Sequence, residues 1–368
     1  MATTLVCVIM LAGIAYFYLK CNIMTSLTNL LAALMGCILA FSYYEQLAGL
    51  LVSESWAVAW IQSATFLLIF FFGFLFIRVL SGFLTKSDFE VTQIAKLSIN
   101  LTCGALTGMV VAGILLVAVG LSPLPPRLFY SRFPLSKPIH LGLSYPPVIN
   151  ADGFAASFYS WVSQSSLSSS KSFAVLHADY LTRLHLNRYA LSKDIPAVCS
   201  YKAIKLPSGN VSPVRLRKFS DTPEMMTVVR LGISASEIHK GGAAEKNHKV
   251  SLIAGQVPLI IKEQDQAGNY TGSAQVIYPA GKMNKGGALE TLALEKNPLD
   301  DGKADEDKKA GLKEGYYWMD LVYQVPQGRK AVLIGFKQNA ILELPKAVPS
   351  TEEIENALNG EQSASGIL

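Results

Sequence analysis

The stretch NLTCGALTGMVVAGILLVAVG, residues 100–120, decides the fold of this chain. It contains no charged residue and is as long as one bilayer crossing, which takes about 20 apolar residues. Small or polar residues recur in it at every fourth position, which places them in one row along a helix face. This small-residue row consists of Asn100, Gly104, Gly108 and Ala112. In lipid such a row lets a second helix approach closely, so we predict a packed membrane helix.

The opposite face of this helix carries larger side chains, namely Met109, Val110, Ile114, Leu115 and Val117. Such a face suits lipid or looser packing. The alternative interpretation is an ordinary apolar span in which the glycines are incidental. We expect everything after this helix to form a separate part of the chain.

Three other apolar stretches precede this one, at residues 4–19, 27–43 and 61–84. The first could be a signal peptide, but no basic residue precedes it and no clear cleavage site follows, so we expect it to be retained. The second has its own row of small residues at four-residue spacing, Ala32, Gly36 and Ala40. The sequence therefore predicts a bundle of four transmembrane helices over residues 1–121.

Charge is unevenly distributed along the chain. Of its 368 residues, 51% are hydrophobic and 16% are charged, against about a quarter charged in soluble domains. The net charge of +5 arises mainly in residues 122–220, which hold twelve Lys or Arg and three Asp or Glu. This basic connector could attract nucleic acid. Its place beside the membrane favours lipid headgroups, so we expect the bilayer as a partner and no nucleic acid.

Amphipathic aromatic and long basic side chains favour the membrane–water interface. The candidates here are Trp56, Trp60, Arg78, Arg127 and Arg132. The loops after the first and third spans are basic, whereas the loop after the second has no basic residue. By the positive-inside rule the basic loops are cytoplasmic, and the C-terminal part lies outside. The basic residues just after the fourth span favour the reverse, but charge in short loops is the better guide.

The connector begins with several prolines, which favour an extended segment. Residues 152–167, DGFAASFYSWVSQSSL, predict an amphipathic helix capped by Asp152. Its apolar face would carry Phe154, Phe158, Trp161 and Val162. Such a helix lies either on the membrane surface or against the domain that follows, and the sequence leaves both open.

From residue 225 the hydrophobic period changes to two. Strand-like runs are MTVVRLGIS, KVSLIAG, VPLIIKE, SAQVIYP, YYWMDLVYQV and KAVLIGFK, separated by turn residues. In one of them, Tyr317, Met319, Leu321, Tyr323 and Val325 share one face. We predict an immunoglobulin-like β-sandwich over residues 225–346, after a connector over 122–224 and before a polar tail over 347–368.

Residues that could carry chemistry do not form a recognisable motif. His177 and His185, on either side of Asp179, would lie about 12 Å apart along a helix, too far for one metal ion. The sequence has no GxSxG elbow, and the acidic stretch at 300–307 does not follow the EF-hand pattern. We therefore predict no catalytic residue, no metal and no cofactor.

The first 121 residues resemble the colicin V production protein (CvpA) family of bacterial inner-membrane proteins. In that family the fourth helix opens with a polar residue followed by glycines at four-residue steps. Asn100, Gly104 and Gly108 match this pattern, with Ala112 and Gly113 where a third glycine is usual. The end of the second helix also matches, at Ala40, Tyr43, Tyr44, Leu47 and Ala48, whereas the first loop, YLKCNIMTSL, departs from the family.

The resemblance implies a multi-pass protein of the bacterial inner membrane with both ends outside the cytoplasm. It implies a role in envelope function or in bacteriocin (toxin) production. We expect a non-enzymatic scaffold whose bundle associates with a second copy, or with other membrane proteins, through the Gly104 and Gly108 face. The β-domain would bind a ligand that the sequence does not name.

Two other functions remain open at this point. The first is an oligomeric channel or passive transporter, in which the small-residue row would face water instead of another helix. The spans lack the acidic and lysine side chains that coupled transporters normally need. The second is a membrane-anchored enzyme with its site on the loops of the β-domain.

Overall fold

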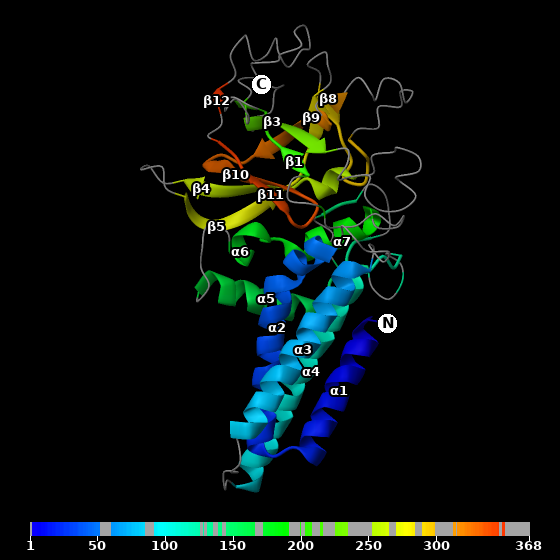
Figure 1. Ribbon diagram of the computed structural model, residues 1–368, viewed down its shortest axis with the longest axis vertical. Coiled ribbons are helices and arrows are strands. Elements are labelled where there is room, and N and C mark those ends of the chain that lie inside the picture. Colours follow the sequence, from blue (N-terminus) through cyan, green and yellow to red (C-terminus); the bar gives the residue numbers. More distant parts are fainter. Residues whose placement is uncertain are drawn as a thin grey trace. The chain divides into compact units, whose positions relative to one another are not determined.

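The computed structural model divides the chain into two compact units (Figure 1). The first comprises Met1–Leu135 and His140–Phe173, and the second Ser136–Ile139 and Ala174–Leu368. The structure describes residues 2–51, 60–84, 92–125, 128, 131–134, 139–141, 145–165, 172–190, 199, 203–207, 214–215, 225–234, 252–264, 270–283, 289–298, 312–313, 315–345 and 348–349.

Four long helices dominate the first unit. They are α1 (Ala2–Lys20), α2 (Ile23–Leu51), α3 (Ile61–Leu84) and α4 (Gln93–Leu121). All four are long and apolar enough to cross a membrane. The second and fourth are longer than the apolar stretches, because residues of good helix propensity, such as those of QIAKLSI before Asn100, extend the helical ladder.

The fourth helix is surrounded by its neighbours. It contacts α1, α2 and α3 as well as α5 (Ala151–Ser165), while α2 and α3 form the other close pair. The prediction of a loosely packed outer face on α4 was wrong, because Val110, Ile114 and Val117 on that face are buried. Neighbouring helices cover most of α4, whatever the size of its side chains, and leave Leu101 and Leu106 exposed.

The first unit also extends further along the chain than expected. It includes α5 and ends at Phe173, whereas the sequence placed a boundary at residue 121. The reason is that α5 packs directly on α4.

The second unit contains two β-sheets. The larger has the strand order β12-β2-β3-β9-β6-β7, with β1 on β3 and β8 on β9, and the smaller has the order β11-β10-β4-β5. The strands are β1 (Ile204–Lys205), β2 (Val214–Arg215), β3 (Met225–Ser234), β4 (Leu259–Gln264), β5 (Tyr270–Ile277), β6 (Gly281–Met283), β7 (Leu289–Thr291), β8 (Leu312–Lys313), β9 (Tyr316–Val325), β10 (Arg329–Phe336), β11 (Ala340–Glu343) and β12 (Val348–Pro349). All pairings are antiparallel except that of β12 with β2.

Both sheets contribute to one hydrophobic core. It includes Leu231 of β3, Leu259 of β4, Leu321 of β9 and Ile334 of β10. The alternation predicted for β9 is confirmed for Met319, Leu321, Tyr323 and Val325, which all lie in this core. Tyr323 also donates a hydrogen bond from its hydroxyl to the Val257 carbonyl oxygen at 2.9 Å.

Two local expectations differ from the structure. The end of the predicted strand KVSLIAG is a 3₁₀ turn, Ala254–Gln256, and residues 249–251 lie outside the described part of the chain. The second unit also contains α7 (Tyr180–Ala190), which packs against this turn and precedes the expected domain start at residue 225. The short helix α6 (Phe173–Leu176) comes just before it. The strand β1 was missed because its two residues carry no clear period.

Candidate helix-packing and membrane-interface site

The glycines of the small-residue row lie against the backbone of α1. A Cβ atom added at Gly104 would lie 2.9 Å from Ile14 Cα, and one added at Gly108 would lie 2.8 Å from Met10 Cα. Gly13 of α1 meets them, since a Cβ there would lie 3.0 Å from the Gly104 carbonyl oxygen. Any side chain larger than hydrogen at these positions would force the two helices apart. This face is therefore filled by α1 of the same chain, and a second copy would need another face.

The polar end of the row is satisfied inside the bundle. Asn100 is 3% exposed, and its Nδ2 donates a hydrogen bond to the Cys21 carbonyl oxygen at 2.9 Å. The Ser26 hydroxyl donates to Asn100 Oδ1 at 2.7 Å. One amide thus joins α4 to the α1–α2 turn and to α2, which satisfies polar groups that would be costly to bury alone. At the other end of the row, Ala112 packs with Ala2 and Val6 of α1.

The second row, on α2, faces α3. Ala32, Gly36 and Ala40 are buried. A Cβ at Gly36 would lie 3.0 Å from the Phe70 carbonyl oxygen and 3.2 Å from the Phe74 nitrogen. Both rows therefore lie at helix–helix contacts within one chain.

The expected interface residues have different surroundings. Trp60 is exposed at the start of α3, and Arg78 is exposed near its end, where Nη2 lies 3.5 Å from the Tyr16 hydroxyl oxygen. Trp56 and Arg127 lie outside the described residues. Arg132 was expected to be available to headgroups, but it is only 8% exposed.

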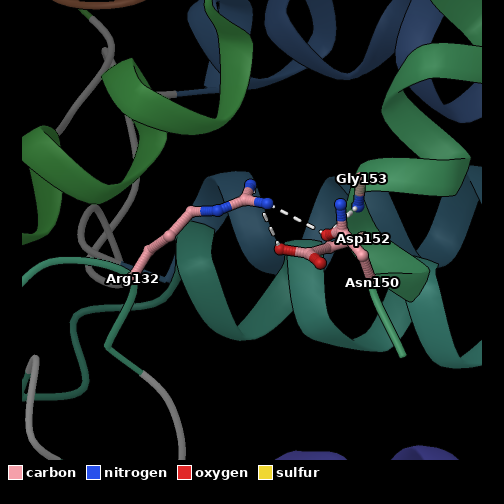
Figure 2. A network of polar contacts seen from close by, with 4 residues as sticks. All are labelled: Arg132, Asn150, Asp152 and Gly153. Carbon is pink, nitrogen blue, oxygen red and sulfur yellow. Dashed lines mark hydrogen bonds and ion pairs between the residues drawn. The ribbon is translucent and has the colours of Figure 1, made fainter. Parts of the chain in front are cut away.

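The buried Arg132 guanidinium belongs to a network at the start of α5 (Figure 2). Its Nη2 donates to Asn150 Oδ1 at 2.9 Å, and its Nη1 lies 3.6 Å from Asp152 Oδ2. The Gly153 backbone N–H also donates to Asn150 Oδ1, at 3.2 Å. Asn150 is therefore the helix cap, and the assignment of that role to Asp152 was wrong. Asn is a preferred cap residue, so the sequence did contain this signal.

The second unit holds a buried polar cluster that sequence reasoning did not identify. Arg183 of α7 is 2% exposed, and it donates from Nη1 to the Leu176 carbonyl oxygen at 2.7 Å and from Nη2 to the Lys337 carbonyl oxygen at 2.8 Å. Its Nη1 also lies 3.2 Å from His177 Nδ1. One arginine therefore joins the segment before α7 to the turn between β10 and β11. The sequence did not indicate this contact, since no local pattern distinguishes a buried arginine from an exposed one.

Another hydrogen bond lies beside Arg183. The Tyr278 hydroxyl donates to Asp179 Oδ2. Burial raises the pKa of the Asp179 carboxyl, and the nearby Arg183 charge and the Tyr278 hydrogen bond only partly oppose this. Burial and the Asp179 carboxylate raise the pKa of Tyr278 well above its ordinary value. Across the described residues, no group of three or more His, Cys, Asp or Glu side chains is placed to hold a metal ion.

The fold and packing site define a class: four helices long enough to cross a membrane, followed by a unit of two β-sheets. Comparison of the chain with protein-family models, curated proteins and solved structures found no match. The resemblance to the CvpA family therefore rests on the matching residues of the second and fourth helices alone.

Proposed function

We propose that this chain is a multi-pass membrane protein whose helical unit is a closed anchor and whose β unit is a non-enzymatic binding or scaffold module. The observation that carries this proposal is the filled small-residue row. A channel lined by this row would expose Asn100 and the glycines to water. Instead Asn100 is hydrogen-bonded within the bundle, and Gly104 and Gly108 lie against the α1 backbone. A row without access to water supports an anchor rather than a path for ions.

The proposal extends to the side of the membrane on which the β unit lies. At the end of the bundle where α1 ends and α4 begins, Lys96 Nζ lies 3.5 Å from Asn22 Oδ1. Lys20 and Arg78 are near the same end. Clustered basic residues favour the cytoplasmic side, which would put the chain after α4 outside the cytoplasm. An immunoglobulin-like sandwich, an inner-membrane location and a CvpA-like role in envelope function or toxin production complete the proposal and rest on the sequence.

Two measurements test the proposal on the full chain. Alkaline phosphatase and a fluorescent protein are each fused after Leu368, and an active phosphatase with a dark fluorescent fusion is expected. The purified protein is then reconstituted in liposomes, and potassium and chloride efflux is expected to match that of empty liposomes. Efflux that rises with protein content, and falls when Asn100 is replaced by Leu, would reject the closed anchor in favour of a channel.

A further inference from the structure

The helix α5 lies across the bundle and not along it (Figure 1). Its start packs on α4, where a Cβ at Gly113 would lie 3.0 Å from Ala155 Cβ. Further along, Tyr159 stacks on Phe41 of α2 with ring centroids 5.4 Å apart. The Tyr159 and Ser42 hydroxyl oxygens are 2.6 Å apart and share a hydrogen bond. One short helix thus bridges two of the long ones.

The two contact points lie at the same height along the bundle. The hydrogen bond between Ser26 and Asn100 fixes a common level for α2 and α4. From that level, Gly113 is about 20 Å along α4 and Ser42 is about 24 Å along α2, at 1.5 Å per residue. Since the two contacts differ in height by only about 4 Å, α5 runs across the long helices instead of along them, as Figure 1 shows.

This height corresponds to the edge of the apolar layer. The first residues of α1, Ala2 and Val6, share a cluster with Ala151 at the start of α5. The 19 residues of α1 are about 28 Å long, close to the hydrocarbon thickness of about 30 Å. If α1 just crosses that layer, its first turn lies at one boundary, and α5 lies at the same boundary.

The two sides of α5 differ in the size and exposure of their side chains. The side toward the bundle carries small residues and Tyr159, which are buried. The other side carries Trp161, which is 64% exposed, beside Phe158 at a ring-centroid distance of 6.5 Å. After Asp152 the helix has no charged residue, and Asp152 itself is paired with Arg132. A helix whose outer side faced water would normally carry charged residues there.

We infer that α5 is an in-plane interfacial helix whose outer edge, Phe158 and Trp161, is embedded in the boundary between lipid headgroups and acyl chains. This inference rests on the proposed function, in which the long helices cross a membrane. Tryptophan favours that boundary because its ring is apolar while its indole N–H can still reach polar groups. The Arg132, Asn150 and Asp152 network fits such a place, because it neutralises the helix start where water is scarce.

Lipid quenching of tryptophan fluorescence tests the inference on the full chain. Trp56, Trp60 and Trp318 are replaced by Phe, which leaves Trp161 as the single tryptophan, and the protein is placed in phosphatidylcholine nanodiscs. Bromine near the headgroup end of the acyl chains should reduce Trp161 emission about twofold, because an interfacial ring lies within contact of it. Bromine near the chain ends should quench less. A matched variant with Trp318 alone, in the β unit, should be unaffected.

Flotation of the same variants with liposomes separates the two proposals. Protein that fails to float would overturn the membrane anchor and with it this inference. Protein that floats but shows no Trp161 quenching would overturn this inference alone, and a disulfide between Phe158→Cys residues of two copies would then assign the edge to a second copy.

If the triple variant does not fold, the wild-type chain labelled with fluorotryptophan tests the same inference. Its Trp161 resonance, identified with Trp161→Phe, should broaden with lipids spin-labelled near the headgroup and stay sharp if the inference is wrong.

Discussion

The α1–α4 contact and the β3–β9 contact join their elements in opposite ways. In the first, glycines allow two helix backbones to lie in contact, and a Cβ at Gly108 would lie 2.8 Å from Met10 Cα. In the second, large side chains meet: Arg230 and Asp320 are cross-strand partners linked by two hydrogen bonds of 2.6 Å. The first contact depends on glycines, which have no side chain, and the second depends on pairing between large side chains.

If the long helices cross a membrane, as we propose, the surrounding solvent explains this difference. In lipid, apolar side chains gain nothing by leaving the solvent, so helices associate through close backbone packing. In water, burial of apolar side chains drives association, and polar groups at the margin must be paired. Burial by itself would lower the pKa of Arg230, but the hydrogen bonds and charge of Asp320 raise it above the ordinary value. The Arg230 guanidinium thus has a charged partner that accepts two of its hydrogen bonds.

The largest effect is expected from adding a side chain to the glycine contact. Gly108→Leu should destabilise the helical unit by about 3 kcal/mol or more, because the new side chain meets backbone that cannot yield locally. Thermal unfolding and gel filtration in detergent measure this effect. Gly82→Leu is the matched control, because none of the described residues lies within 4 Å of a Cβ at that position of α3. Equal stability of the two variants would refute the packing interpretation of the row.

An intermediate effect is expected from breaking the ion pair between strands. Arg230→Ala should destabilise the β unit by about 2 kcal/mol, since it leaves the Asp320 carboxylate partly buried without its charged partner. The free energy of unfolding of the full chain in nanodiscs, followed by the β-sheet signal, measures it. Arg230→Met combined with Asp320→Leu should recover most of the loss, because no unpaired charge remains. A double variant as unstable as the single one would show that packing, not charge, is lost.

The smallest effect concerns the pH dependence of the second unit. The pKa of Asp179 is raised in the folded state, so the folded protein holds a proton that the unfolded chain releases above about pH 4. The contribution of Asp179 to stability is therefore fully present below that pH and is lost as the pH rises through the folded pKa. Asp179→Asn cannot ionise and keeps an acceptor for Tyr278, so its melting temperature should change less between pH 4 and pH 7.

The exposed acid Glu263 provides the control for that experiment. Glu263→Gln removes a carboxylate that is 53% exposed and pairs with Arg329 at 2.9 Å. Exposed ion pairs contribute little, so this variant should follow the wild-type profile. If Asp179→Asn also followed the wild-type profile, the buried carboxyl would have no measurable part in the pH dependence.

Much of the architecture was readable from local patterns. Long apolar stretches identified the four helices, and the two-residue period placed β3, β4, β5, β9 and β10. The four-residue spacing also found the residues at two helix contacts, because one face of a helix is fixed by its geometry. The pattern did not identify the partner: Gly104 could have met a second copy, and it meets Ile14 of the same chain.

Single polar residues were the least predictable part of the molecule. Asp152 looked like a cap but pairs with Arg132, while Asn150 caps the helix. Arg132 looked available to headgroups and is buried. A cap or an ion pair depends on which chain segments meet in space, and residues 132 and 150 meet only after the connector has folded back.

The sequence by itself determined where the long helices and most strands lie, because apolar length and period reflect the local backbone. Only the tertiary structure decided that α1 fills the glycine face of α4, that α5 crosses the bundle, and that Arg183 joins α7 to the turn between β10 and β11. These contacts join residues far apart in the chain. Their energies depend on fit and on the pairing of buried polar atoms, which no local pattern records.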